Sequence, residues 1–175
     1  MTHNHNTPPL AEQLASALLK HGWMLATAES CTGGMIAARC TDLAGSSQWL
    51  ERGFVSYSNE AKHDMLGVDP ALIAQHGAVS AEVAQAMALG ALRHSQAQVS
   101  LAVTGVAGPT GGSKEKPVGT VWFAWALPSD TGPTLGSDTA WVKTECVHFN
   151  GDRASVREAT LQHALATLLH WLQQH

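Results

Sequence analysis

The sequence predicts an α/β domain with three layers, α/β/α, in which helices cover both faces of a mainly parallel or mixed sheet. Short apolar segments typical of strands alternate along the chain with longer segments whose apolar residues have helical spacing. The 175 residues are enough for one domain with a substantial core, and no linker or internal repeat divides them. We therefore expect a flexible tail at residues 1–8 and one domain over residues 9–175.

The N-terminal part is predicted to run from helix to strand to turn to helix. Residues 10–22 have the apolar spacing of an amphipathic helix that a glycine ends. Residues 23–27 then form a short buried strand, and a second helix begins near Thr32 or Gly33. Ser30 therefore lies at a strand-to-helix turn.

The rest of the chain continues this alternation. Asn59 and Ser80 can cap helices over residues 59–66 and 81–94, and Asp152 can cap the C-terminal helix. Strands are expected at residues 49–57, 99–104, 120–127 and 141–149, with a turn-rich connection at residues 128–138.

The composition excludes several classes of protein. Charged residues make up 14% of the chain and the formal net charge is −4, without a basic stripe that could follow a phosphate backbone, so we expect no nucleic-acid partner. No apolar segment approaches the length of a membrane span, and the N-terminus lacks the apolar core of a signal peptide. We expect a cytoplasmic protein with no membrane partner.

Cysteine and histidine give no sign of a disulfide, a metal or a cofactor. The three cysteines form no CxxC pair, which favours a reducing compartment. The ten histidines include no HExxH arrangement, and His3 and His5 lie in the tail, where they could bind adventitious metal only. The sequence therefore predicts neither a metal nor a cofactor.

Ser30 is the first candidate nucleophile. A serine at a strand-to-helix turn is held rigidly beside free helix N–H groups that can stabilise an oxyanion, which is the geometry that acyl transfer requires. Ser30 or Thr32 could equally act as a helix cap, which is the commoner role of such residues. The paired Gly33 and Gly34 favour the close approach of a ligand to the backbone.

Cys31 is a rival nucleophile, because a helix N-terminus lowers the pKa of a nearby thiol. The commoner role of a free cysteine is that of a small buried side chain. If the helix begins at Thr32, Ser30 and Cys31 cannot both point into one cleft. Only one of them can then be the nucleophile.

A serine nucleophile needs a base, and residues 62–64 offer three. Lys62, His63 and Asp64 point in different directions on a helix, so they cannot form a ready triad. A desolvated Lys62 could act as the base of a Ser-Lys enzyme. A lysine in such a position is more often a solvated surface residue, and the pattern leaves both roles open.

Residues 105–119 are rich in glycine and could either contact a ligand or simply connect two strands. They contain no P-loop, because Lys114 is followed by Glu115 where that motif has serine or threonine. An NTPase is therefore not expected.

Several blocks of this sequence together resemble the CinA C-terminal domain family. They occur in order and cover nearly the whole chain from Pro9 to the C-terminal helix. The blocks are Thr27-Ala-Glu-Ser-Cys-Thr-Gly-Gly34, Gly53-Phe-Val-Ser-Tyr-Ser-Asn-Glu-Ala-Lys62 followed by Leu66-Gly-Val68, His76-Gly-Ala-Val-Ser80, Thr104-Gly-Val-Ala-Gly-Pro109, Lys116-Pro-Val-Gly-Thr-Val-Trp122 and Phe149-Asn-Gly-Asp-Arg153.

This resemblance implies a Ser-Lys amidase that hydrolyses the carboxamide of nicotinamide mononucleotide to nicotinate mononucleotide and ammonia. It implies Ser30 as the nucleophile, Lys62 as the general base and Tyr57 as a neighbour that orients or polarises the pair. For this mechanism the pKa of Lys62 must lie well below that of a free lysine, and burial is one physical cause.

The substrate contacts are expected at both glycine-rich segments and at the start of the last helix. Backbone N–H groups at the Thr32-Gly33 turn or near Thr104-Gly105 would hold the oxyanion. Arg153 is the candidate for the phosphate, with a structural ion pair as its other role. The expected substrate-binding residues are Thr32, Gly33, Gly34, Thr104, Gly105, Gly108, Gly111 and Arg153.

Two other functions compete with the Ser-Lys amidase. One is a catalytically silent nucleotide-binding or competence-related regulatory module of the same fold, which would not need both Ser30 and Lys62. The other is a thiol-dependent amidohydrolase that uses Cys31. A homo-oligomer that completes its sites across an interface is a further expectation.

Overall fold

The computed structural model describes residues 9–129 and 140–175, and these form five strands and six α-helices. The predicted tail at residues 1–8 and residues 130–138 of the predicted connection lie outside the described residues. The strands are β1 (Leu25–Glu29), β2 (Leu50–Val55), β3 (Val99–Gly105), β4 (Thr120–Pro128) and β5 (Ala140–His148). The helices are α1 (Leu10–His21), α2 (Met35–Thr41), α3 (Asn59–Leu66), α4 (Pro70–His76), α5 (Ala81–Arg93) and α6 (Arg153–Leu172), with a short 3-10 helix at Ser46–Gln48.

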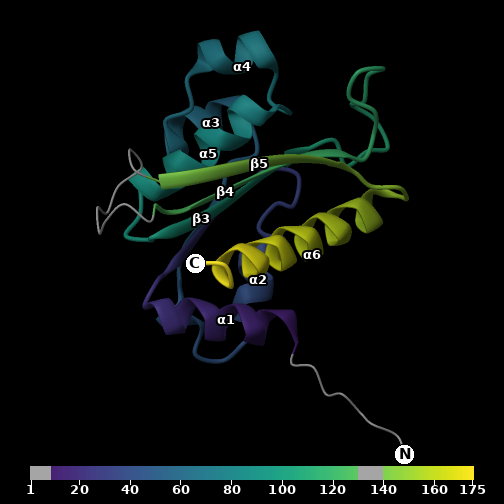
Figure 1. Cartoon of the computed structure of the whole chain (residues 1–175). Coiled ribbons are helices and arrows are strands. Elements are labelled where there is room, and N and C mark those ends of the chain that lie inside the picture. Colours follow the sequence, from purple (N-terminus) through teal and green to yellow (C-terminus); the bar gives the residue numbers. More distant parts are fainter. Residues whose placement is uncertain (1–8, 130–139) are drawn as a thin grey trace, which may run out of the picture.

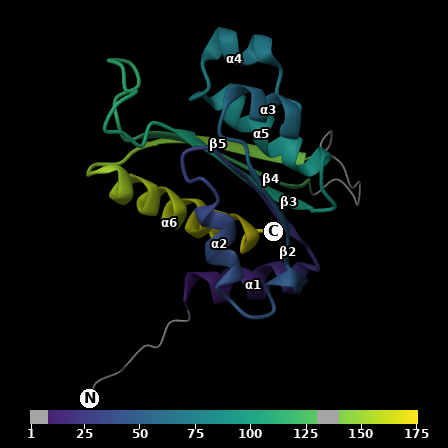
Figure 2. The ribbon, with the colours of Figure 1, turned by 180° about the vertical axis from the view of Figure 1, so that it is seen from behind.

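The five strands form one open mixed sheet in the order β2-β1-β3-β4-β5. The strands β2, β1 and β3 run parallel, and β4 and β5 continue the sheet in antiparallel pairs. Helices α1, α2 and α6 cover one face and α3, α4 and α5 lie on the other, as the two opposite views show (Figures 1 and 2). The predicted α/β class with a sheet between two helical layers is confirmed.

Each face of the sheet has its own apolar core. Leu14, Trp125 and Leu168 belong to the cluster between the sheet, α1 and α6, and each is at most 1% exposed. Met87 and Ala102 belong to the cluster under α5. Full burial of a large apolar side chain stabilises a fold by about 1.5–3 kcal/mol, so these two cores hold the sheet rigidly between its helical layers.

The connections on either side of β1 diverge to opposite faces. Helix α2 links β1 to β2 on one face, whereas α3, α4 and α5 link β2 back to β3 on the other face. The carboxyl ends of β1 and β3 therefore lie where the strand order reverses, and open α/β sheets bind ligands in the crevice at such a point.

The elements on either side of Ser30 begin later than the sequence predicts. Strand β1 begins at Leu25 because the N–H of Trp23 is still used to close α1, donating to the carbonyl of Leu18 at 3.0 Å. Helix α2 begins at Met35, because Gly34 has a left-handed backbone conformation (φ 96°) that no helical residue adopts. The expectation of a helix from Thr32 or Gly33 is therefore wrong.

Two further expectations for the helices need correction. The cap of α3 is Ser58, whose Oγ accepts a hydrogen bond from the N–H of Ala61 at 3.0 Å, and Asn59 is the first helical residue. Helix α4 was not expected, although Asp69 and Pro70 carry a signal for it. Asp69 accepts a hydrogen bond from the backbone at the N-cap, and Pro70 occupies the first helical position, where its missing N–H costs nothing.

Helices α3 and α5 approach closely at Gly90. A Cβ atom at this position would lie 3.0 Å from the Cβ of Leu66 and would overlap its carbonyl oxygen. Only glycine permits this approach, although it costs about 1 kcal/mol relative to alanine within a helix.

No helix among the described residues combines the length and the hydrophobicity that crossing a bilayer requires.

Candidate active site

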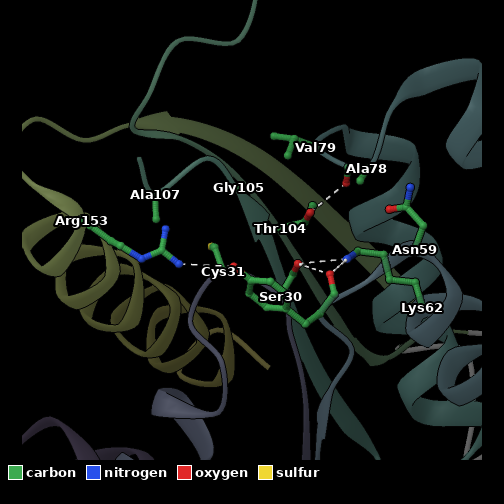
Figure 3. Close-up of a pocket in the computed structure, with 11 residues that line it drawn as sticks. Ser30, Cys31, Asn59, Lys62, Ala78, Val79, Thr104, Gly105, Ala107 and Arg153 are labelled. Atoms are coloured by element: carbon green, nitrogen blue, oxygen red, sulfur yellow. Dashed lines mark hydrogen bonds between the residues drawn. The ribbon is translucent and has the colours of Figure 1, made fainter. Parts of the chain in front are cut away.

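A pocket opens at the carboxyl ends of β1 and β3, in the crevice where the connections diverge (Figure 3). Its volume is about 200 Å³. Ser30 and Cys31 come from the turn after β1, Thr104 and Gly105 from the end of β3, and Lys62 from α3. Segments far apart in sequence thus meet at one edge of the sheet.

Ser30 and Lys62 are in direct contact. The Nζ atom of Lys62 lies 3.0 Å from Ser30 Oγ, and it also lies 3.0 Å from the carbonyl oxygens of Ser56 and Tyr57. A protonated amine donates to all three oxygens. A neutral amine donates its two hydrogens to the two carbonyls, and its lone pair then faces the Ser30 hydroxyl. The geometry therefore suits a serine hydroxyl that gives its proton to a neutral lysine.

Burial shifts the protonation equilibrium of Lys62 toward this neutral form. The side chain is 1% exposed, and no carboxylate of the described residues is hydrogen-bonded to its Nζ. Desolvation lowers the pKa of Lys62 from 10.5 to about 8, against a smaller opposing effect of Cys31. A substantial fraction of Lys62 is then neutral near physiological pH, as a general base requires.

Tyr57 contacts the pair through its backbone. Its carbonyl oxygen accepts from Lys62 Nζ and lies 3.4 Å from Ser30 Oγ, which can also donate to it. Its side chain is 58% exposed and extends away to Arg153, whose Nη2 lies 3.3 Å from the phenol oxygen. The carbonyl of Tyr57 thus contacts both members of the pair, whereas its phenol lies in a different part of the pocket.

Cys31 is a poor alternative to Ser30. Its thiol is 5% exposed, and burial raises its pKa to about 11. The thiol therefore stays protonated near neutral pH, where only the thiolate is an effective nucleophile. Ser30 and Cys31 both line the pocket. The condition under which only one of them could point into it does not hold, because α2 begins at Met35 and not at Thr32.

The buried carboxylate of Glu29 organises the turn after β1, and sequence reasoning gave it no role. Its two oxygens accept hydrogen bonds from Thr32 Oγ1 at 2.7 Å, from the N–H groups of Ile36 and Ala37 at 2.9 and 3.0 Å, and from Thr27 Oγ1 at 3.3 Å. The side chain is fully buried. The N–H groups at the start of α2 are therefore occupied, and the expectation that they are free to hold an oxyanion is wrong. The sequence gives no signal for this role, because Glu29 follows the predicted strand at residues 23–27 and lies in a polar segment.

The paired glycines of the turn are explained by backbone conformation. Gly33 and Gly34 have φ values of 60° and 96°, which L-residues rarely adopt. The N–H of Gly33 donates to the carbonyl of Ser30 at 3.1 Å, which closes the turn. Neither glycine lines the pocket, so ligand approach is not needed to account for them.

Arg157 of α6 contacts the same turn from outside the pocket. Its Nε donates to the carbonyl of Cys31 at 3.1 Å and its Nη2 to the carbonyl of Thr32 at 2.9 Å. No sequence pattern links α6 to this turn, since the partners are more than 120 residues apart.

The last residue of β3, Gly105, presents its backbone to the pocket. Residues along a strand face alternate neighbours. The carbonyl of Val103 accepts from the N–H of Ser30 on the β1 side, and the N–H of Val106 donates to Thr120 on the β4 side. The N–H of Gly105 therefore points to the β1 side, where β1 has already ended and the carbonyl of Ser30 is bonded to Gly33 instead.

The neighbouring Thr104 has a structural contact. Its Oγ1 donates to the carbonyl of Ala78 at 2.8 Å, which holds the segment before α5 as one wall of the pocket. A side chain at Gly105 is excluded, because a Cβ there would lie 2.8 Å from Val121 and 2.9 Å from the carbonyl oxygen of Thr120.

Arg153 lines the pocket at the side opposite Lys62 (Figure 3). Its Nη1 donates to the carbonyl of Gly108 at 2.7 Å, and it forms no ion pair within the described residues. The carboxylate of Asp152 caps α6 by accepting from the N–H of Ser155 at 2.8 Å, so the N-terminus of α6 is already occupied by a negative group. The guanidinium is the cationic group that this side of the pocket offers to an anion.

The pocket thus brings together six of the predicted site residues. These are Ser30, Tyr57, Lys62, Thr104, Gly105 and Arg153. Thr32, Gly33, Gly34, Gly108 and Gly111 do not line it. Of the three residues considered as base, only Lys62 does, and His63 places its Nδ1 3.0 Å from the carbonyl of Val68.

Asn59 also lines the pocket, and the sequence suggested it only as a helix cap. It lies one helical turn before Lys62, on the same side of the pocket (Figure 3). Its side-chain amide has no hydrogen-bond partner within residues 9–129 and 140–175. In the same described ranges, no group of three or more His, Cys, Asp or Glu side chains could hold a metal ion.

Comparison with protein families identifies the relatives of this chain. A family model described as the CinA C-terminal domain matches residues 7–172. The nicotinamide-nucleotide amidohydrolase PncC of Escherichia coli K12 is 51% identical over 164 residues, which cover 94% of this chain and 92% of that protein. A CinA-like protein of Geobacter is also 51% identical, and there the match covers 94% of this chain and 36% of the longer relative.

Solved structures show the same fold. A CinA superfamily protein from Klebsiella pneumoniae matches with a TM-score of 0.85 and 37% identity, covering 95% of this chain and 97% of that one. The competence/damage inducible protein CihA from Agrobacterium tumefaciens matches with a TM-score of 0.80 and 43% identity, again covering 95% and 97% of the two chains.

Proposed function

The chain belongs to the CinA C-terminal domain family, and on this premise we propose that it is an amidohydrolase that converts nicotinamide mononucleotide to nicotinate mononucleotide and ammonia. The name of its relative from Escherichia coli supports the substrate class. The observation that carries the proposal is the contact between Lys62 Nζ and Ser30 Oγ at 3.0 Å, with two carbonyls ready to accept the other hydrogens of the amine.

The reaction begins with Ser30. Neutral Lys62 takes the proton of the hydroxyl as Oγ attacks the carboxamide carbon. The carbonyl oxygen of the substrate becomes an oxyanion, and the N–H of Gly105 is the donor that we assign to it. This assignment rests on the direction of the Gly105 N–H and on the use of the Gly33, Ile36 and Ala37 N–H groups within the turn.

The leaving group departs on the side of α3. Lys62 returns the proton to the departing amine, so ammonia leaves and the acyl group remains on Ser30 as an ester. Asn59, with its unpaired amide beside Lys62, accepts an N–H of the carboxamide and so orients the nitrogen toward Lys62 Nζ. Lys62 then takes a proton from water, hydroxide adds to the ester, and nicotinate mononucleotide is released as Ser30 regains its proton.

The phosphate lies at the other side of the pocket. The volume of about 200 Å³ is below the usual range for ligand pockets of about 300–1,000 Å³, so the pocket accommodates the ring, with the ribose phosphate at its mouth. Arg153 supplies the charge there, and Gly108 orients the guanidinium through its carbonyl. Direct substrate contacts of Thr32, Gly33, Gly34, Gly108 and Gly111 stay predictions.

We also place the enzyme in the cytoplasm, since its three cysteines are free thiols. The homo-oligomer expected from the sequence stays a prediction, which sedimentation equilibrium of the full chain would test.

Ammonia release from nicotinamide mononucleotide tests the proposed function. The wild type should release ammonia, and Ser30→Ala and Lys62→Ala should each lose activity by about 10³-fold or more while they remain folded by circular dichroism. Substantial turnover by either variant would overturn the Ser-Lys mechanism. Binding of the nucleotide by the wild type without turnover would instead favour a silent nucleotide-binding module.

A further inference from the structure

The nucleophile turn, which we define as residues 30–34, is held by two charged side chains that lie outside the pocket. Glu29 immediately precedes the turn and Arg157 reaches it from α6. Neither residue lines the pocket. Their contacts with the reacting groups are therefore indirect, and those of Arg157 pass through the turn.

Glu29 fixes the inner side of the turn. Its carboxylate accepts from Thr32 Oγ1 within the turn and from the N–H groups of Ile36 and Ala37 just beyond it. Its backbone carbonyl accepts from the N–H of Ser56 at 2.9 Å, next to the carbonyls that hold Lys62. The residue before the nucleophile is thus tied to both sides of the reacting pair.

Arg157 fixes the outer side. Its guanidinium donates to two consecutive carbonyls, those of Cys31 and Thr32, at 3.1 and 2.9 Å. It forms no ion pair with a carboxylate anywhere in the described part of the chain. An arginine usually pairs its charge with a carboxylate or a phosphate. Arg157 instead donates to two backbone oxygens, and because its guanidinium is planar and rigid, these hydrogen bonds constrain the direction of both carbonyls.

The effect follows from the planarity of the peptide bond. When the carbonyls of Cys31 and Thr32 are held toward α6, the planes of the two peptide bonds that they begin are fixed as well. Gly33 and Gly34 could otherwise allow many conformations, because glycine restricts the backbone least. Arg157 therefore fixes the two peptide bonds that lead into Gly33, the start of the least restricted part of the turn.

We propose that Arg157 is a positioning residue for the nucleophile. The Glu29 carboxylate holds Thr32 and the start of α2, Arg157 holds the carbonyls of Cys31 and Thr32, and together they keep Ser30 Oγ at hydrogen-bond distance from Lys62. This inference rests on the proposed role of Ser30 as nucleophile. A displacement of about 1 Å in a reacting group can lower a rate by about 100-fold, so a loosened turn should slow the attack by Ser30 without weakening substrate binding.

The test compares Arg157→Met with Arg39→Met. Arg39 is a matched control, because it also bridges to α6, through an Nη1 contact of 3.5 Å with Glu158, but does not contact the turn. Two readouts are needed, the rate at which a fluorophosphonate probe modifies Ser30 and the separate values of kcat and KM for nicotinamide mononucleotide. Circular dichroism and the melting temperature establish that both variants are folded at the assay temperature.

We expect Arg157→Met to lower both the modification rate and kcat by about 10- to 100-fold, with KM changed by less than about threefold. Arg39→Met should stay within about twofold of the wild type in both readouts. Arg157→Lys should have modification and kcat values close to those of Arg157→Met, because an ammonium cannot form both hydrogen bonds of the guanidinium. Millimolar guanidinium added to Arg157→Ala should restore part of the modification rate and part of kcat.

A wild-type modification rate in Arg157→Met would overturn the positioning role, as would a loss confined to KM or an equal loss in Arg39→Met. If Arg157→Met does not fold, the guanidinium rescue of Arg157→Ala and the behaviour of Arg157→Lys decide the question. The proposed substrate is tested independently. A wild type whose Ser30 reacts with the probe but which does not hydrolyse nicotinamide mononucleotide would contradict the substrate and leave the positioning role testable by the probe. A wild type whose Ser30 does not react with the probe would remove the premise and the inference together.

Discussion

The carbonyl oxygen of Tyr57 lies 3.0 Å from Lys62 Nζ, whereas the phenol of the same residue contacts Arg153. The backbone and the side chain of Tyr57 thus serve opposite ends of the pocket. A substitution that keeps the backbone can therefore separate the two contributions.

Tyr57→Phe should leave kcat within about threefold of the wild type and raise KM about fivefold, because only the hydrogen bond between the phenol and Arg153 is lost, worth about 1 kcal/mol. Steady-state kinetics with nicotinamide mononucleotide measure this, and circular dichroism controls for folding. A large loss of kcat at unchanged KM would instead assign the phenol to the chemistry.

The pH dependence of the reaction should report Lys62. Its folded-state pKa of about 8 means that the neutral base is lost as the pH falls, so kcat/KM should decrease about tenfold per pH unit below pH 8 and level off above it. The pyridinium of the bound substrate disfavours a second positive charge, so the limb for kcat should lie at lower pH than the limb for kcat/KM. A profile that is flat from pH 6 to pH 9 would contradict the role of Lys62 as base.

Lys62 should also make the stability of the protein depend on pH. Its pKa is about 8 when folded and 10.5 for an ordinary lysine, so between these values the unfolded chain binds more protons and the stability rises with pH. Below pH 8 Lys62 is protonated in both states, so the full cost of burying its charge lowers the free energy of unfolding. Relative to Lys62→Met, the wild type should therefore gain about 3 kcal/mol in its free energy of unfolding between pH 7 and pH 10.5.

Urea unfolding of both proteins across this pH range measures the gain. The exposed Lys20 of α1 provides the control. The free energies of unfolding of Lys20→Met and the wild type should differ by less than about 0.5 kcal/mol at any pH. A difference between the wild type and Lys62→Met that does not vary with pH would mean that folding leaves the pKa of Lys62 unchanged.

Asn59 should distinguish amides from esters. If its amide accepts an N–H of the carboxamide, Asn59→Ala should lower kcat/KM for nicotinamide mononucleotide about 10-fold or more. The methyl ester of nicotinate mononucleotide has no such N–H, and its hydrolysis should change by less than about threefold. Equal losses on both substrates would contradict this role of Asn59.

Much of the fold could be predicted because the strands and helices follow hydrophobic periodicity and capping residues. Ser80 and Asp152 cap α5 and α6 as expected, accepting hydrogen bonds from the N–H groups of Val83 and Ser155. The start of α2 could not be predicted, because it depends on the buried carboxylate of Glu29. Local pattern alone does not show where such a side chain points.

For the site, the contact between Ser30 and Lys62 agrees with the pair that the family resemblance implies, but the surroundings of the pair could not be predicted. The acceptors of Lys62 are backbone carbonyls of Ser56 and Tyr57, and any residue type carries a carbonyl, so side-chain chemistry gives no signal for them. The contact of Arg157 with the turn joins segments that only the packing of α6 on the sheet brings together.

The close approach of α3 and α5 at Gly90 places a demand on the sequence far from the pocket. A larger residue at this position would push Leu66 outward, and with it the helix that carries Lys62. The better helix former alanine therefore does not fit at Gly90, even though that change would favour α5 taken alone. The packing of α5 on α3 thus restricts this position of α5, and a Gly90→Ala substitution would set the gain in helix propensity against a displaced α3.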